Sequence, residues 1–432
     1  MNESIAATAP MTAAAQPGLY QRIVLDALGK MTAGSLTLEL PDGTKRTIGT
    51  QGASTHATIR VRDVAFFKRC VLHGDIGFGE SYVDGEWDTD NIERVISWAV
   101  LNIENSPAMS GSKTRSFALG LLKFTNRINH LLRPNSITTA RQNIAEHYDL
   151  GNDFYSLWLD PTMTYSSAIF TTPDQSLEAA QIEKYDSLCR KLHIRSGDHV
   201  LEIGSGWGGF ACHAVKNYGC RVTTVTISQE QFLYAKERFQ REGIADQVDI
   251  LLEDYRKLDG KFDKIVSIEM MEALGDRYLP TYCRQLHRLL KPHGMVGVQY
   301  ITVPDNRHAE LRRGVDWIQK HIFPGSLLLS ISRVNAAMNK TGDLFLHDIK
   351  DIGLSYARTL RMWFDNFNAR LAEVRALGFD DRFIRKWNYY LQYCEAAFAM
   401  RNISVVQAVY TLPNNPRLRS GPFLNNKGTL NR

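Results

Sequence analysis

Apolar and polar residues alternate near the start of the chain. Residues 36–40 alternate leucine with polar side chains, and the turn sequence Pro41-Asp42-Gly43 separates them from a second alternating run over 44–48. A period of two around a short turn predicts a β-hairpin. Residues 58–62 predict a further strand, and apolar side chains at helical spacing over 92–103 predict an amphipathic helix. Together these elements predict a small α+β domain over residues 18–105.

From residue 198 onward, short apolar runs alternate with segments of helical spacing. This order is typical of an α/β fold with a doubly wound parallel sheet. Two later apolar runs predict antiparallel strands at the edge of that sheet. The expected strands are 198–203, 221–226, 248–252, 264–268, 295–301, 343–352 and 403–410, and the expected helices end near 217 and 235 or span 282–290, 366–377 and 381–399.

Three segments have the composition of terminal or connecting chain. Residues 1–17 are rich in Ala, Thr and Ser and lack the basic start and apolar middle of a secretory signal, which predicts a disordered leader. Residues 106–140 are expected to hold a linker and a basic amphipathic helix, 113–133, which either packs on the next domain, the favoured interpretation, or lies on an anionic membrane. The main domain is expected over 141–415, followed by a flexible tail, 416–432.

Composition narrows the classes of protein to which the chain can belong. It has 432 residues, of which 44% are hydrophobic and 22% charged, and a formal net charge of +5, values that indicate a soluble globular protein of two or three domains. No apolar run approaches the roughly 18 residues that cross a bilayer. The mild positive charge permits attraction to anionic lipid or nucleic acid without requiring either. The six cysteines form no Cys-x-x-Cys pair, which favours reduced thiols of a cytosolic protein and predicts no metal site.

The first strand of the predicted sheet ends in a glycine-rich loop, 202–209, that opens a helix. Its glycines match the spacing Gly-x-Gly-x-x-Gly of dinucleotide-binding loops, which is weak support by itself. Glu202 precedes the first glycine, the second strand ends without a carboxylate for a ribose, and Glu253-Asp254 follows the third strand. S-adenosylmethionine has an ammonium group, which needs a nearby carboxylate, and it has no phosphate, so it needs no anion-binding site. These features favour S-adenosylmethionine over NAD. A purely structural turn has less support than either cofactor.

A series of motifs follows in fixed order along the chain. They are EHYDLGNDFY at 146–155, LDPTMTYS at 159–166, LEIGSGWGG at 201–209, IEMME at 268–272 with Gly275, IFPG at 322–325, YARTL at 356–360 and CEAAFAMR at 394–401. In these motifs the chain resembles the cyclopropane-fatty-acyl-phospholipid synthase family, which includes the mycolic acid cyclopropane synthases. Residues 74–82 are similar to the extra domain of the phospholipid-acting members. The resemblance implies a class I S-adenosylmethionine-dependent methyltransferase sheet, which is Rossmann-like, with a small N-terminal α+β domain.

The resemblance implies transfer of a methyl group to the cis double bond of phospholipid acyl chains, followed by loss of a proton and closure of a cyclopropane ring. An alkene is a weak nucleophile, so such a site must exclude water and stabilise a carbocation until a base takes the proton. In the family that base is a bicarbonate ion, whose ligands map onto Glu272, Tyr356 and the carbonyl of Ile268. Two further ligands, a Cys and a His in the family, are Ser167 and Gln299 here, which weakens the case for the same proton relay and leaves Glu272 as a candidate base itself.

Cofactor contacts also carry over from the resemblance. Thr226 and Gln231 are expected near the ribose, and Asp254 and Tyr255 near the adenine. A Trp-Glu pair of the family is replaced by Tyr255-Arg256, which keeps an aromatic face and changes the charge. The full set of expected cofactor-binding residues is Tyr165, Ser166, Glu202, Gly204, Gly206, Thr226, Gln231, Asp254 and Tyr255.

Other functions remain open alongside cyclopropane formation. A C-methyltransferase that gives methyl- or methylene-branched acyl chains is one alternative, because the chain departs from the usual family residues at Ser167, Ala273 and Gln299. A non-catalytic lipid-binding module with the same fold is a further alternative, and an NAD oxidoreductase ranks lowest. The expected partners are unsaturated phospholipid acyl chains and an anionic membrane surface, with no nucleic acid and with a homodimer as a plausible assembly. The expected location is cytoplasmic, peripherally associated with the inner face of the membrane.

Overall fold

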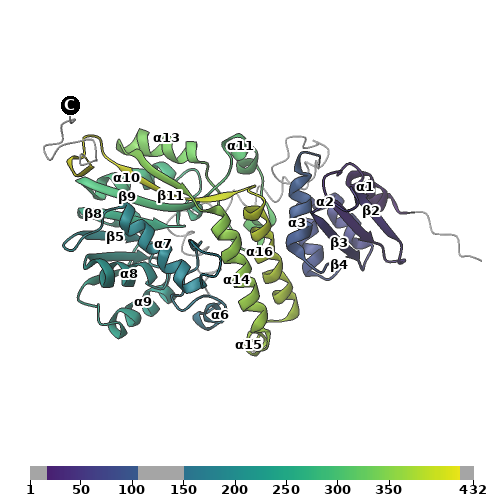
Figure 1. Ribbon diagram of the computed structural model, residues 1–432, viewed down its shortest axis with the longest axis horizontal. Coiled ribbons are helices and arrows are strands. Elements are labelled where there is room, and N and C mark those ends of the chain that lie inside the picture. The colour runs from purple at the N-terminus through teal and green to yellow at the C-terminus, as the bar shows by residue number, and fades with distance from the viewer. Residues whose placement is uncertain (1–16, 106–149, 419–432) are drawn as a thin grey trace, which may run out of the picture.

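The computed structural model describes residues 17–105, the N-terminal unit, and residues 150–418, the C-terminal unit (Figure 1). The predictions of a disordered leader, of a basic helix over 113–133 and of most of the flexible tail lie outside these residues. Each unit is built on its own β-sheet. Between the two sheets lie helices α14 (Gly353–Ala369) and α16 (Asp381–Ala399).

The N-terminal unit has a four-stranded sheet in the order β2-β1-β3-β4. The predicted hairpin is confirmed, because β1 and β2 pair antiparallel, and β3 pairs with β1 in parallel. Helix α2 was not predicted; its sequence is rich in glycine, and it is kinked at Gly74, where φ is 60° and ψ is −134°. The strands are β1 (Ser35–Glu39), β2 (Lys45–Gly49), β3 (His56–Val61) and β4 (Trp87–Asp88), and the helices are α1 (Leu19–Leu28), α2 (Ala65–Val83), α3 (Ile92–Leu101) and the 3-10 helix η1 (Ile103–Asn105).

The C-terminal unit alternates strands and helices along the chain. Its strands are β5 (His199–Ile203), β6 (Arg221–Thr226), β7 (Val248–Leu252), β8 (Phe262–Ile268), β9 (Leu290–Thr302), β10 (Phe345–Asp351) and β11 (Ser404–Thr411). Besides α14 and α16, its α-helices are α6 (Asn152–Ser156), α7 (Leu177–Lys191), α8 (Gly209–Tyr218), α9 (Gln229–Arg241), α10 (Leu279–Leu289), α11 (Asp305–Arg313), α12 (Trp317–His321), α13 (Ile331–Gly342) and α15 (Leu371–Ala376). Its 3-10 helices are η3 (Tyr255–Lys257), η4 (Met271–Ala273) and η5 (Pro416–Leu418).

These strands form one sheet in the order β10-β11-β9-β8-β5-β6-β7. Strands β5 to β9 pair in parallel, which confirms the predicted doubly wound parallel sheet. The strand order reverses between β5 and β8. In an open parallel sheet, ligands bind beside the carboxyl ends of the strands at such a switch point. The topology therefore locates a binding site at the ends of β5 and β8.

The expectation that both final strands are edge strands is wrong for β11. Strand β11 lies between β9 and β10 and pairs antiparallel with both, so only β10 is at the edge. The side chains of β11 are buried along almost its whole length, whereas those of β10 are largely exposed. Strand β11 is largely apolar because both of its faces are covered, which is typical of a strand in the interior of a sheet.

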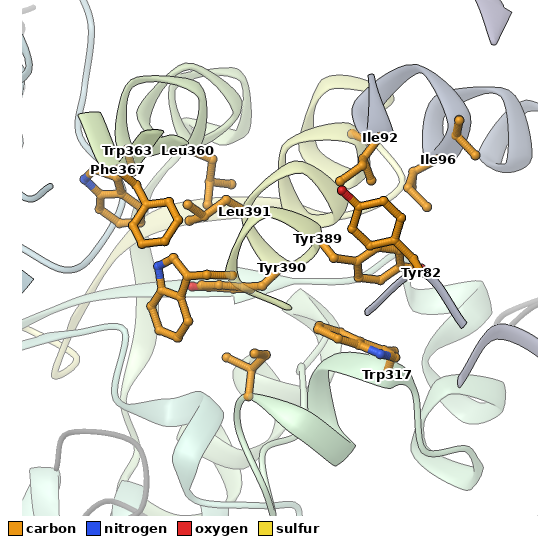
Figure 2. Packing of buried hydrophobic residues seen from close by; sticks show 14 of the residues in the cluster. Tyr82, Ile92, Ile96, Trp317, Leu360, Trp363, Phe367, Tyr389, Tyr390 and Leu391 are labelled. Carbon is orange, nitrogen blue, oxygen red and sulfur yellow. The ribbon is translucent and has the colours of Figure 1, made fainter. Parts of the chain in front are cut away.

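A single hydrophobic cluster runs through both units, from Leu36 on β1 to Trp363 on α14. Helix α16 contributes to it on two faces, with Tyr389 and Tyr390 as adjacent members. Tyr389 packs on Trp317 with a ring separation of 4.6 Å and on Tyr82 of α2 at 5.7 Å (Figure 2). The two sheets are thus joined by a shared core. None of the described helices is long and apolar enough to cross a membrane.

Candidate active site

A cavity of about 390 Å³ lies at the carboxyl ends of the parallel strands. Its polar end is lined by the loops that follow β5, β6 and β7, with Glu202, Thr226 and Asp254 among the lining residues. Its apolar end is lined by the segment around Phe323 and by α14 and α16, whose contributions include Phe398. One cavity therefore offers a compartment for a polar ligand and a compartment for an apolar one.

The loop between β5 and α8 brings backbone atoms close to this cavity. Gly204, Gly206 and Gly208 have φ values of 95°, 49° and 84°, which are left-handed conformations that favour glycine. A Cβ atom on Gly208 would lie 2.7 Å from the ring of Phe239, so the loop also packs too closely for a larger residue. The first turn of α8 then presents backbone N–H groups at the mouth of the loop.

The polar side chains around the loop are held in place by hydrogen bonds. The hydroxyl of Thr224 donates to Glu202 at 2.5 Å, and burial raises the pKa of Glu202 to about 8. The hydroxyl of Thr226 donates to the side chain of Gln231 at 2.9 Å. Burial alone would raise the pKa of Asp254, but hydrogen bonds from Arg256 outweigh it and leave that pKa below its usual range. These groups form a rigid polar wall.

The residues predicted to bind the cofactor all line this one cavity. Tyr165 and Ser166 enter it from the segment before α7. The hydroxyl of Tyr165 lies 2.7 Å from that of Tyr390 on α16, and Ser166 accepts a hydrogen bond of 2.7 Å from Nζ of Lys184 on α7. The structure thus brings together residues that are far apart in the sequence, as the resemblance requires.

Glu269, directly after β8, is the centre of the buried polar cluster. Its Oε1 accepts a hydrogen bond of 2.8 Å from the backbone N–H of Ser167 and one of 2.8 Å from Nε2 of Gln299. Its Oε2 accepts a hydrogen bond of 2.9 Å from the hydroxyl of Tyr356. Burial raises the pKa of Glu269 above its usual range, and the hydrogen bonds from Gln299 and Ser167 limit that rise. The carboxyl group is therefore a buried, well-oriented proton acceptor.

The backbone at Glu269 is unusual as well. Its φ is 49°, in the left-handed region that residues with a side chain seldom adopt. Its N–H donates to the carbonyl of Gln299 on β9 at 2.7 Å. Strained backbone of this kind occurs at functional sites, where the surrounding structure holds it. The turn directs the side chain of Glu269 toward α14 and β9.

Lys184 supplies a buried cation beside this cluster, and sequence patterns gave no signal for it. Its side chain is fully buried on α7. Burial lowers the pKa of Lys184 to about 7, and the nearby carboxyl groups of Glu269, Asp160 and Glu202 oppose that fall. The charged ammonium group of Lys184 has three N–H donors, one of which bonds to the hydroxyl of Ser166. Because its pKa lies near neutral pH, the charge of Lys184 depends on the charge of the neighbouring carboxyl groups.

Glu272, the predicted catalytic carboxylate, is placed differently from the expectation. It lines the cavity, and its Oε1 accepts a short hydrogen bond of 2.5 Å from the backbone N–H of Ile301. Its Oε2 is buried and has no hydrogen-bond partner among the described residues. Burial and repulsion from Glu269 raise the pKa of Glu272 to about 8. Near neutral pH this group is a neutral acid, and the carboxylate that contacts Tyr356 is Glu269.

Three other predicted residues surround Glu269. Gln299 donates from its side chain, as expected. Ser167 donates from its backbone N–H, whereas its hydroxyl bonds to the carbonyl of Ala168, so the expected hydroxyl donor is not used. Ile268 lines the cavity at the end of β8. The motif block 268–272 contained the signal for Glu269, because a carboxylate immediately after a parallel strand points to the ligand-binding edge.

The family model described as mycolic acid cyclopropane synthetase matches residues 135–408. The chain belongs to the mycolic acid cyclopropane synthetase family. It is 39% identical over 372 residues to the tuberculostearic acid methyltransferase UfaA1 of Mycobacterium tuberculosis, which covers 84% of this chain and 83% of that protein. It is 38% identical over 362 residues to the cyclopropane-fatty-acyl-phospholipid synthase of Escherichia coli K12, which covers 83% of this chain and 88% of that protein.

Solved structures of family members have the same fold. The cyclopropane synthase MmaA2 of Mycobacterium tuberculosis aligns with a TM-score of 0.58 at 29% identity, over 62% of this chain and 97% of that one. The mycolic acid cyclopropane synthase CmaA1, complexed with SAH and CTAB, aligns with a TM-score of 0.58 at 30% identity and the same coverage. As a member of this family, the protein is an S-adenosylmethionine-dependent methyltransferase with a class I fold.

The donor set of the site fits the cofactor and does not fit a bicarbonate ion. The glycine loop, whose left-handed backbone carries no side chain at Gly204 and Gly206, allows the close approach that S-adenosylmethionine needs. Of the donors expected to hold bicarbonate, the side chains of Gln299 and Tyr356 already donate to the carboxylate of Glu269, and the hydroxyl of Ser167 bonds to the carbonyl of Ala168. That carboxylate takes the place of the expected anion in the hydrogen-bond network.

Proposed function

We propose that the protein transfers the methyl group of S-adenosylmethionine to the cis double bond of an unsaturated phospholipid acyl chain, with Glu269 as the base. The observation that carries this proposal is the Glu269 carboxylate, which lines the cavity and is held by three donors. Relatives named as a tuberculostearic acid methyltransferase and a cyclopropane-fatty-acyl-phospholipid synthase support a fatty acyl substrate.

The residues at one end of the cavity bind the cofactor, and those at the other end surround the acyl chain. When bound, S-adenosylmethionine supplies an electrophilic methyl group. Glu202 and the glycine loop hold its polar part, and the apolar wall around Phe323 and Phe398 excludes water from the acyl chain. The rings of Tyr356 and Phe398, which pack on each other with centroids 4.5 Å apart, line the cavity and place aromatic surface near the cation that forms when the double bond takes up the methyl group.

Glu269 then accepts a proton from the carbon that was transferred. The C–H electron pair forms the new bond to the cationic carbon, a cyclopropane ring closes, and the proton ends on the carboxylate. The raised pKa of Glu269 matches this role, because a base works best when its pKa lies close to the working pH. Glu272, a neutral acid with one unpartnered oxygen, lines the cavity close to Glu269 without extra negative charge.

A second product, a branched chain, is favoured by the altered hydrogen-bond network. In it a hydride shifts from the methylated carbon to the cationic carbon, and proton loss from the methyl group then gives a methylene branch without a ring. Glu269 can serve as base for either outcome. The replacement of an expected free anion by a tethered side chain, and the 39% identity to a relative named as a methyltransferase, support this alternative.

We further propose that the protein is cytoplasmic and binds peripherally to the inner face of the membrane, because the acyl chains that it modifies lie in the bilayer. The formal net charge of +5 supports attraction to anionic headgroups. Co-sedimentation with anionic liposomes should fall as ionic strength rises, since salt screens exposed charges. Binding that does not change with salt would remove the electrostatic part of this proposal.

The deciding experiment incubates the purified protein with methyl-labelled S-adenosylmethionine and liposomes of cis-unsaturated phospholipid. Proton NMR of the released fatty acids separates the products, because ring protons resonate upfield of ordinary alkyl signals. Label in ring carbons supports cyclopropane formation, and label in a methyl or methylene branch supports the second product. Absence of label from lipid with wild-type protein that binds the cofactor would refute the proposed function.

A further inference from the structure

The polar cluster around Glu269 continues behind it to Gln407 on β11, which plays no part in the steps above. Gln407 and Gln299 are directly opposite in the antiparallel pairing of β11 with β9. Directly opposite residues of such a pair point to the same face of the sheet, within contact distance. Both side chains are buried, with exposed fractions of 0% and 1%.

The orientation of the Gln407 amide is fixed by its neighbours on α7. Its Nε2 donates to the carbonyl of Lys184 at 3.1 Å, and a backbone carbonyl can only accept. Its Oε1 accepts a hydrogen bond of 2.7 Å from the hydroxyl of Ser187. Exchanging the amide nitrogen and oxygen would set two oxygens against each other at Lys184, so only one orientation satisfies both contacts.

This orientation determines that of Gln299. Nε2 of Gln407 also donates to Oε1 of Gln299 at 3.1 Å. The Nε2 group of Gln299 is therefore turned to the other side, where it donates to Glu269 at 2.8 Å and to the carbonyl of Ser167 at 3.2 Å. The reversed amide would place its oxygen against a carboxylate and a carbonyl, which are both acceptors.

We propose that Gln407 is a positioning residue, which orients the Gln299 amide so that its N–H group points at the carboxylate that takes the proton. This inference rests on the proposed function in one respect, namely that Glu269 is the base. It adds a residue that lies 108 positions after Gln299, on the neighbouring strand, and outside the motifs that carried the family resemblance.

The effect of Gln407 on the pKa of Glu269 can be separated from the effects of the charged and titratable groups that face Glu269. They are Lys184 from α7, Glu272 from η4 and Tyr356 from α14. Replacing Gln407 by methionine changes none of these groups and keeps the length of the side chain. It removes the donor that holds Oε1 of Gln299, so the amide is less firmly oriented and its hydrogen bond to Glu269, which favours the charged form of that carboxyl group, is weakened.

The test is the pH profile of methyl transfer by Gln407→Met. Loss of one hydrogen bond should move the acid limb of the profile to higher pH by about half to one pH unit. Thr411→Val is the matched control, because Thr411 is equally buried on β11 and bonds to Gly294, Leu412 and Asn415 rather than toward Glu269. That control should lower the thermal midpoint without moving the acid limb.

A double-variant cycle separates positioning from general damage. In a Gln299→Met background, Gln407→Met should cause no further shift, because its effect passes through Gln299. Shifts that add, or an unchanged acid limb in the single variant, would overturn the inference. If Gln407→Met does not fold, Ser187→Ala, which removes only the hydroxyl that bonds to Gln407, should shift the limb in the same direction by a smaller amount.

Failure of the proposed function would be recognised separately. Should the wild type transfer no methyl group to lipid, the protonation of Glu269 can still be followed by the infrared carboxyl band that differs between the wild type and Glu269→Gln. Gln407→Met should move the midpoint of that band to higher pH. An unchanged midpoint would refute the positioning role whatever the substrate.

Discussion

Glu269 combines a buried carboxylate with a left-handed backbone, and the proposed function assigns proton removal to this one side chain. Glu269→Gln should lower methyl transfer by about 100-fold or more, the usual contribution of a general base. Glu272→Gln should lower it by less than about 10-fold, because Glu272 is largely protonated near neutral pH. Initial rates with labelled cofactor measure both effects.

A chemical-rescue experiment is the control for this pair of variants. Glu269→Gly would leave the donors of Ser167, Gln299 and Tyr356 without an acceptor, and glycine tolerates the φ of 49° at that position. Added formate or bicarbonate should restore part of the activity of this variant and should leave the wild type unchanged. Equal losses in Glu269→Gln and Glu272→Gln, with no rescue, would argue against Glu269 as the base.

Glu272 also makes a testable contribution to stability. Its pKa is about 8 in the folded protein against an ordinary value of 4.5, so between these pH values the folded state holds a proton that the unfolded chain lacks. Stability should therefore fall as pH rises through this window, with a contribution from this group of about 1.4 kcal/mol per pH unit. Glu272→Gln keeps an acceptor for Ile301 and should flatten that slope in urea unfolding. A slope identical to that of the wild type would contradict the assignment.

At the scale of single residues, the sequence located the cavity but did not reveal every residue that contacts the buried carboxylate. Every cofactor residue expected from the motifs lines one cavity, and most of these residues lie at or near the carboxyl ends of predicted strands. Motif matching assigned Glu272 and did not consider Glu269, since linear spacing does not reveal that the side chain of Glu269 contacts Tyr356. Lys184 and Gln407 gave no signal, because their partners come from distant segments.

Among the elements, α16 links the two units through a polar contact as well as apolar ones. Oε1 of Gln392 accepts a hydrogen bond of 3.1 Å from the backbone N–H of Ile92, in the first turn of α3. Gln392→Leu would leave this N–H group buried without an acceptor and should lower the free energy of unfolding by about 1–3 kcal/mol. The matched change Gln240→Leu, at an exposed position of α9, should have little effect on denaturant unfolding. Equal effects of the two changes would show that the contact is not stabilising.

The strands were predicted within a few residues, and several helices were not. Strands β6 and β7 match their expected ranges because short runs rich in β-branched and aliphatic residues are distinctive. The predicted helix 366–377 covers only the last four residues of α14 and all of α15, since α14 begins at Gly353 without a side-chain cap. Helix α2 was missed because its glycines weaken the helical pattern. Start signals of helices depend on polar N-cap residues, and in these two helices the N-cap residues are Val64 and Ile352.

At the scale of the whole molecule, the shared hydrophobic cluster predicts cooperative unfolding. Residues of both units, among them Trp87 and Trp387, belong to one buried cluster. Separating the units would expose the aromatic contacts of Tyr389 with Trp317 and Tyr82 (Figure 2). Calorimetry of the full chain should therefore give one unfolding transition. Two well-separated transitions would mean that the expected domains, 18–105 and 141–415, are independently stable.

The tethered carboxylate of Glu269 also bears on how the enzyme responds to its surroundings. An enzyme that takes its base from solution depends on dissolved carbon dioxide and on how much of it is hydrated and ionised. With Glu269 as the base, every folded molecule carries its own, at a fixed position and in a fixed ratio of one to one. Lipid modification by this protein would then continue at the same rate in degassed and in carbonated medium.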